Sequence, residues 1–167
     1  SMFADKEGSI WIGTVGGGLG RLRPSKFISY SADQGLPNNV VRSLLQRRNG
    51  EIWVGTEGGF GKMDGQGFVA FKTSSKPAND IVLSLFEDRE GALLVGTTAG
   101  LKILKNGNIR HFTTKDGLSS NDIRAIYQDR SGAYWLATRK GGLDVLQNGK
   151  FTNLNRTAGF PTDTVRV

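Results

Sequence analysis

The stretch Glu51-Ile52-Trp53-Val54-Gly55-Thr56 decides the fold, because the chain repeats it with small changes at three other places. The other copies are Ser9-Ile10-Trp11-Ile12-Gly13-Thr14, Ala92-Leu93-Leu94-Val95-Gly96-Thr97 and Ala133-Tyr134-Trp135-Leu136-Ala137-Thr138. With Trp11, Trp53, Leu94 and Trp135 as markers of one repeat position, the spacings are 42, 41 and 41 residues. A fixed period of this length indicates a repeat architecture.

Each repeat begins with an apolar run, at residues 40–45, 81–86 and 123–127, which we expect to be a strand buried on both faces. A turn with Asp first and Gly fourth follows, as at 5–8, 88–91 and 129–132, and its carboxylate is expected to accept bonds from local backbone amides. The repeated six-residue stretch, which we call the hexapeptide, is predicted to be the second strand. A glycine turn, a third strand and a fourth strand complete the unit; the fourth strands are predicted at 26–30, 67–71, 108–112 and 150–154.

Four short strands in each repeat of about 41–42 residues, with no helical periodicity, predict an all-β fold: a β-propeller built of four-stranded antiparallel blades. We interpret residues 1–167 as a single propeller segment of four repeats, with Ser1 as a remnant of expression. The first strand is expected to be split between the termini, with one half at 164–167 and the other at 2–5.

A single blade cannot cover its own apolar faces, so the blades must stack. Two arrangements stay open: the chain closes on itself as a four-bladed ring, or copies join head to tail. We expect head-to-tail self-association, as a homodimer that completes a ring.

The composition is that of a globular, basic chain. The net charge is +7 and the pI about 9.9, and because the basic residues are dispersed we favour a solvated basic surface over a site for an anionic ligand. The sequence has no recognition helix, zinc knuckle or RNA-binding aromatic motif, so we expect no nucleic-acid partner. The chain has no cysteine, which excludes disulfides and thiolate chemistry. It also has no apolar run long enough to cross a membrane and no signal peptide, and we expect no direct membrane contact.

Two segments give the pattern a family likeness: Gly-Leu-Pro-Asn-Asn-Val at 35–40 and Asp-Gly-Leu-Ser-Ser-Asn-Asp-Ile at 116–123. Together with the hexapeptide and its glycine turn, they resemble the two-component regulator propeller repeat over essentially the whole chain. Repeat three departs from the pattern at Leu94 and repeat four at Ala137. The resemblance implies a periplasmic sensor region of a bacterial hybrid histidine kinase, which senses oligosaccharides and whose output domains lie outside these residues.

One column of the first strands carries the sharpest site hypothesis: Arg42, Leu83, Arg124 and Arg166. If these strands line a central channel, the guanidiniums would bind carboxylate or sulfate groups at the propeller mouth through bidentate bonds. The alternative is that each arginine pairs with a neighbouring carboxylate.

The loop before each first strand ends in Asn39, Asp80, Asn121 or Asp163, and such loops commonly form the binding face of a propeller. We take Asn39 and Asn121 as candidate ligand-binding residues. The alternative, which recurrence in every repeat favours, is a turn in which each side chain bonds the next backbone amides. The tryptophans are expected in the core rather than stacked on sugars.

The sequence places no catalytic constellation, metal cluster or cofactor motif, so we predict that the protein is not an enzyme and needs no cofactor. His111 is the only histidine, and the Asp-x-x-Gly turns lack the ligands of a calcium loop. The leading hypothesis is a periplasmic sensor segment that binds an oligosaccharide or another polar or anionic ligand. The alternatives are a protein-interaction scaffold that mediates oligomerisation and, less favoured, a propeller lyase or glycosidase.

Overall fold

The computed structural model describes residues 1–23, 26–71 and 81–165. Within these ranges the regular elements are strands, together with three single-turn 3-10 helices. In the part of the chain so described, no helix is long and apolar enough to cross a membrane.

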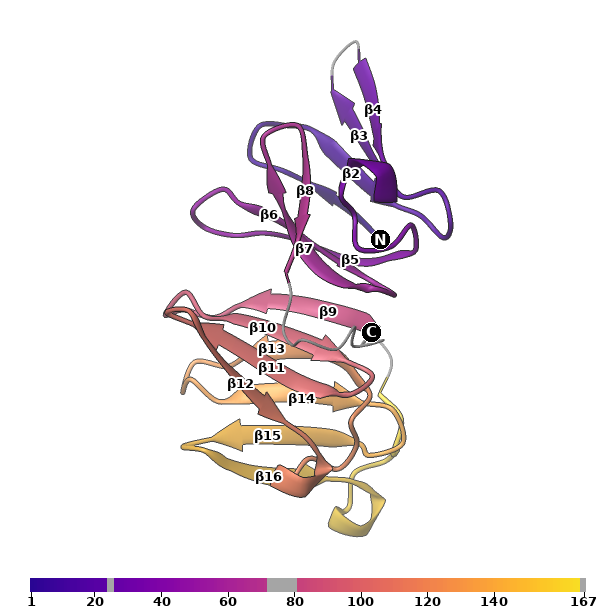
Figure 1. Ribbon diagram of the computed structural model, residues 1–167. Coiled ribbons are helices and arrows are strands. Elements are labelled where there is room, and N and C mark those ends of the chain that lie inside the picture. The colour runs from indigo at the N-terminus through magenta and orange to yellow at the C-terminus, as the bar shows by residue number, and fades with distance from the viewer. Residues whose placement is uncertain (24–25, 72–80, 166–167) are drawn as a thin grey trace. The chain divides into compact units, whose positions relative to one another are not determined.

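The strands form four antiparallel sheets of four strands, one for each sequence repeat (Figure 1). The first two sheets contain β1 (Met2–Ala4), β2 (Ile10–Gly13), β3 (Leu19–Arg23) and β4 (Lys26–Tyr30), then β5 (Val41–Gln46), β6 (Ile52–Thr56), β7 (Gly59–Asp64) and β8 (Gly67–Ala70). The last two contain β9 (Val82–Glu87), β10 (Leu93–Thr97), β11 (Gly100–Lys105) and β12 (Asn108–Phe112), then β13 (Ile123–Gln128), β14 (Tyr134–Thr138), β15 (Leu143–Gln147) and β16 (Lys150–Leu154). Each sheet is a simple meander, so the prediction of four-stranded propeller blades is confirmed.

The chain divides into two compact units, Ser1–Val82 and Leu83–Val167, which we call the N-terminal and C-terminal units. The core of the N-terminal unit lies between its two sheets, where Trp11 and Tyr30 of the first sheet meet Val54 and Phe68 of the second. The C-terminal unit repeats this arrangement with Leu94 and Leu101 against Ile123 and Leu136.

In repeats two and three the second strand is the deeply buried one. Every residue of β6 and of β10 is buried, whereas most residues of β5, β9 and β13 are half-buried. The expectation that the first strand is buried on both faces is therefore wrong. The second strand has a hydrogen-bonded neighbour on each side, while the first strand is an edge of its sheet and has one.

The Gly-Thr end of the hexapeptide fits two local requirements. A Cβ on Gly13 would lie 2.6 Å from the Val41 side chain, so glycine lets the next sheet approach closely. The threonine hydroxyl that follows donates to a carbonyl of the glycine turn in all four repeats, at 2.8–3.0 Å. This bond ties the second strand to the turn that leads into the third.

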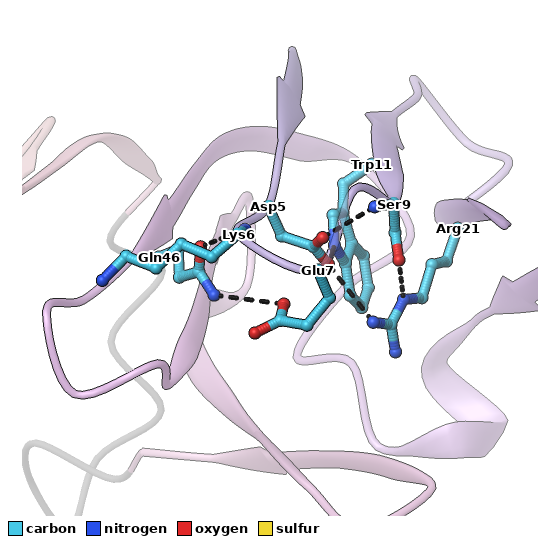
Figure 2. A network of polar contacts seen from close by, with 7 residues as sticks. All are labelled: Asp5, Lys6, Glu7, Ser9, Trp11, Arg21 and Gln46. Carbon is cyan, nitrogen blue, oxygen red and sulfur yellow. Dashed lines mark hydrogen bonds and ion pairs between the residues drawn. The ribbon is translucent and has the colours of Figure 1, made fainter.

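Neighbouring sheets within each unit are also joined through their first turns. In the N-terminal unit the Lys6 backbone N–H donates to Gln46 Oε1 at 2.9 Å, and Figure 2 shows Gln46 reaching across to the 5–8 turn. In the C-terminal unit the Arg89 N–H donates to Gln128 Oε1 at 3.0 Å. Gln46 and Gln128 hold equivalent positions, and each links the two sheets within its own unit.

Candidate functional site

The predicted site residues lie at the end of each unit that carries the loop before the first strand; we call this the loop end. The loops of this kind at 31–40, 113–122 and 155–163 each contain a 3-10 helix: η1 (Ala32–Gln34), η2 (Thr114–Asp116) and η3 (Arg156–Ala158). Asn39 and Arg42 lie at the loop end of the N-terminal unit, and Asn121 and Arg124 at that of the C-terminal unit. Arg166 and Asp80 lie outside the described residues.

The asparagines close these loops upon themselves. Asn39 Oδ1 accepts the Ala32 N–H at 2.7 Å and Asn121 Oδ1 accepts the Thr114 N–H at 2.8 Å, so each side chain holds the first residue of a 3-10 helix. Asp163 does the same for η3. The expected turn onto the next backbone amides is wrong for these residues.

That turn is made one position earlier. Asn38 Oδ1 accepts the Val40 N–H at 2.7 Å, and Ser120 Oγ accepts the Asp122 N–H at 3.3 Å. A side-chain oxygen can accept a hydrogen bond from the backbone amide two residues later in the chain. Because Asn38 and Ser120 make this bond, the next side chains, Asn39 and Asn121, are available to bond the start of the 3-10 helix. A ligand role for Asn39 and Asn121 stays a prediction.

Arg42 pairs with a carboxylate, as the alternative interpretation expected. Its Nε donates to Glu57 Oε1 at 3.1 Å, and its Nη2 contacts the same oxygen. Glu57 stands on the glycine turn after β6, and both side chains are about one-third to two-fifths exposed. The pair is electrically balanced and accessible to solvent.

Arg124 pairs with a carboxylate of the loop that precedes its own strand. Its Nη2 donates to Asp122 Oδ2 at 2.9 Å, and its Nε lies 2.7 Å from Asp122 Oδ1 as an ion-pair contact. Arg139 adds a second guanidinium, with Nη1 4.0 Å from the same Oδ2. The three side chains form what we call the Arg-Asp-Arg cluster: Asp122, Arg124 and Arg139.

This cluster carries one more cation than carboxylate, and Lys140 adds another charge beside it. Lys140 has φ 68°, a left-handed conformation that costs a non-glycine residue roughly 1–2 kcal/mol. At the equivalent turn position repeat one has Gly16, with φ 83°. The C-terminal unit therefore keeps a cation where a glycine would fit the backbone better.

A buried carboxylate holds the loop that carries this cluster. Asp144 of β15 is fully buried and accepts the Ser119 N–H at 2.9 Å and Asn153 Nδ2 at 2.7 Å. Sequence reasoning missed Asp144, Asp122 and Arg139. For Asp144 a signal existed, since Gly20 and Gly61 occupy its position in the first two repeats.

The tryptophan column is structural, and in repeats one and four its acceptor is the first-turn aspartate. Trp11 Nε1 donates to Asp5 Oδ2 at 2.7 Å, and Figure 2 shows Arg21 and Ser9 beside the same carboxylate. Burial alone would raise the pKa of Asp5, but the bonds from Trp11 and Ser9 and the charge of Arg21 hold that pKa below its usual value. The expectation that these indoles pack in the core is confirmed for Trp11, which is fully buried.

Metal-ligating side chains form no cluster in the described ranges. There, no three His, Cys, Asp or Glu side chains lie close enough together to hold a metal ion. His111 Nε2 lies 3.0 Å from the Ala99 carbonyl oxygen, an ordinary fourth-strand contact. The charged groups of the loop end are paired donors and acceptors, an arrangement suited to recognising polar groups.

Two segments of the sequence, 35–58 and 117–140, match the profile of the two-component regulator propeller. The resemblance predicted from the repeat pattern is therefore confirmed for these segments. Each spans the end of a loop, the whole first strand and the hexapeptide. A comparison with curated proteins found no match.

The fold is similar to solved structures. The extracellular domain of a hybrid two-component system from B. thetaiotaomicron is 26% identical, with a TM-score of 0.87 over 98% of this chain. A second such domain from that organism is 22% identical, with a TM-score of 0.77 over 92% of this chain. The chain spans 23% and 24% of the lengths of these two structures.

A virginiamycin B lyase from Staphylococcus aureus shares the fold at lower similarity. It is 16% identical, with a TM-score of 0.69 over 92% of this chain and 54% of its own. At that identity the likeness concerns the fold alone. The chain is thus a propeller segment similar to extracellular domains of two-component systems.

Proposed function

We propose that this chain is the ligand-sensing part of a periplasmic β-propeller in a bacterial two-component signalling protein. The single observation that carries the proposal is the 26% identity to the extracellular domain of a hybrid two-component system, extending over 98% of the chain. Ligand binding would shift the geometry of the propeller and so switch an output domain. The protein itself would carry out no chemical conversion.

We place the ligand at the loop end of the C-terminal unit, on the Arg-Asp-Arg cluster. The Arg124 and Arg139 guanidiniums present several N–H donors, and the Asp122 carboxylate presents acceptors, which together suit the hydroxyl and acidic groups of an oligosaccharide. The side chains of Arg124 and Asp122 are 36% and 20% exposed, so the cluster is ordered by packing yet reachable. Asp144 accepts a hydrogen bond from the Ser119 N–H and so holds the loop that precedes β13.

The test is a thermal-shift screen with neutral, carboxylated and sulfated disaccharides, followed by calorimetric titration of every hit. We expect a saturable rise in melting temperature with one class of sugar. Arg124→Gln should weaken that binding at least tenfold. Arg130→Gln removes the same charge from the exposed turn at the other end of β13 and should leave binding unchanged.

Chromatography of the same mixtures separates a sensor from an enzyme. Recovery of the intact sugar supports the proposal, whereas accumulation of shorter or unsaturated products would assign a lyase or hydrolase activity. No saturable shift with any sugar would favour the scaffold alternative.

The head-to-tail homodimer is a separate proposal. Light scattering across a concentration series should give a mass near twice 18.1 kDa. A concentration-independent mass of 18.1 kDa would overturn it.

A further inference from the structure

The C-terminal unit contains a cleft of about 290 Å³ between its two sheets. One wall is formed by β11 and β12, and the other by β14 and the turn between β15 and β16. The cleft lies at the end of β13 opposite Arg124, so it is separate from the Arg-Asp-Arg cluster. Its volume suits a ligand of one sugar-sized ring rather than an oligosaccharide.

The cleft lies where repeat three lacks its tryptophan. In repeat one the indole of Trp11 donates to Asp5, and Arg21 lies over the same indole at 4.7 Å from the ring centroid. Leu94 and Ile103 hold the equivalent positions in repeat three. Both are smaller and apolar, so the space beside the turn carboxylate is not filled by the blade's own side chains.

The N-terminal unit has a counterpart of this cleft with a different inner wall. That counterpart is wider, at about 550 Å³, and its lining includes Arg21, Arg23 and Tyr30 but not Asp5. The lining of the cleft in the C-terminal unit includes Asp88, the counterpart of Asp5. The two clefts therefore differ in whether the turn carboxylate is part of the site.

Two groups take over the contacts of the missing indole. The Tyr134 hydroxyl, from the next blade, donates to Asp88 Oδ2 at 2.6 Å. The Arg110 guanidinium covers the face of Phe112, 5.1 Å from the ring centroid. In repeat one that ring face belongs to Tyr30 and is stacked by Trp11 at 6.0 Å.

Arg110 has no carboxylate partner among the described residues. Its guanidinium lies over the Phe112 ring instead. The other charges of the cleft are satisfied: Lys105 pairs with Glu90, and Asp88 accepts the Ala92 N–H and the Tyr134 hydroxyl. Asn108, Gln147 and Asn148 line the same cleft and bring amide groups to it.

We propose that this cleft binds a small hydroxylated carboxylate, of the sugar-acid class. The carboxylate would form a bidentate pair with Arg110, which has two N–H edges suited to it. The ligand hydroxyls would bond to the amides of Asn108, Gln147 and Asn148 and to the Tyr134 hydroxyl. The lining thus combines one unpaired cation with neutral donors and acceptors.

The experiment is calorimetric titration of the protein with D-glucuronate, with D-glucose as the neutral control and sodium sulfate as the simple-anion control. We expect saturable binding of D-glucuronate that is at least tenfold tighter than that of either control. Equal binding of D-glucose would overturn the carboxylate assignment, and equal binding of sulfate would overturn the role of the hydroxyls.

Three variants locate the site. Arg110→Gln removes an exposed charge without opening the core and should abolish D-glucuronate binding. Leu94→Trp, combined with Tyr134→Phe, restores the indole of the other repeats and should also abolish it, with the fold verified by circular dichroism. Arg156→Gln removes a charge from η3, outside both proposed sites, and should leave it unchanged. Full binding by Arg110→Gln, or its loss in Arg156→Gln, would refute the proposal.

Discussion

Repeats one and three solve the same packing problem in different ways. In repeat one a single tryptophan stacks on Tyr30 and donates to Asp5, so one side chain fills the space and satisfies the carboxylate. In repeat three the two tasks are separated, since Arg110 covers the ring of Phe112 and Tyr134 satisfies Asp88. The contrast teaches that the repeat conserves the contacts of the turn rather than the residue that makes them.

Repeat two supports this interpretation because it keeps the tryptophan and lacks the turn aspartate. It keeps Trp53 but has Arg47 where the others have aspartate, and the indole donates instead to Glu51 Oε2 at 3.2 Å. Arg47 and Lys62 pair with the same Glu51. A carboxylate beside the second strand is therefore kept in every repeat, either from the turn or from the strand end.

The largest effect is expected where one side chain has both tasks. Trp11→Ala should lower the free energy of unfolding by about 3–5 kcal/mol, because it opens a cavity in the core and leaves Asp5 without its indole donor. Chemical denaturation measures the loss. Trp135→Ala, at a half-buried position with the same bond to Asp129, should cost less by at least about 1 kcal/mol. Equal losses would contradict the comparison.

The divided arrangement of repeat three predicts a smaller loss. Tyr134→Phe removes only the hydroxyl that donates to Asp88 and should cost about 2 kcal/mol. Burial, together with the Asp88 carboxylate, raises the pKa of Tyr134, so this bond should persist through mildly alkaline pH. Urea denaturation is the measurement, and Tyr127→Phe, at an exposed site, is the matched control. If Tyr134→Phe lowered the free energy of unfolding by no more than Tyr127→Phe does, the Tyr134 hydroxyl would not replace the indole.

The carboxylate of repeat two predicts a pH effect. The bond from Lys62 lowers the pKa of Glu51 to about 2 from its usual 4.5, with Trp53 contributing a further bond. A lowered pKa stabilises the fold above about pH 4.5, and that stability is lost as the pH falls toward 2. Glu51→Gln should therefore cost about 1–2 kcal/mol at pH 7, after allowance for the partial exposure of both partners.

Near pH 2 the wild type and Glu51→Gln should become equally stable in thermal denaturation. A gap that stays constant from pH 7 to pH 2 would show that the charge of Glu51 is not the source of the effect. The bonds from Ser131 and Trp135 also lower the pKa of Asp129 to about 2, so Asp129→Asn should show the same direction of pH dependence.

The smallest effect concerns the loop ends. Lys140→Gly should raise the free energy of unfolding by about 0.5–1 kcal/mol, because glycine adopts positive φ without the strain of a side chain. Asn148→Gly, at φ 50°, is the control and should change little, since asparagine tolerates this conformation. If Lys140→Gly also weakened sugar binding, the strained cation would be part of the site. A loss of stability instead would contradict the strain argument.

The repeat pattern predicted much of the fold for a physical reason. The strand order recurs four times, so the fourth strands at 26–30, 108–112 and 150–154 coincide with β4, β12 and β16. The period could not show which strand is most buried, because that depends on the neighbours of each strand within its sheet.

The site residues were less predictable, because their partners come from different segments. Arg42 and Arg124 share one sequence column, yet the first pairs with a carboxylate on a glycine turn and the second with one in a loop. Nor does the sequence show that Tyr134 extends to Asp88 of the preceding blade, since that contact requires the packing between two sheets. Departures from the repeat, such as Leu94 and Asp144, were the available signal.

The most direct test of the contrast between repeats one and three is a D-glucuronate titration followed by side-chain amide and guanidinium NMR signals. The account predicts saturable shifts of Arg110 and of the amides of Asn108 and Asn148 in the C-terminal unit. It predicts no saturable shift of Gln66 or Arg23, which line the counterpart cleft of the N-terminal unit. Shifts of equal size and midpoint in both clefts would contradict the claim that loss of the tryptophan created a distinct site.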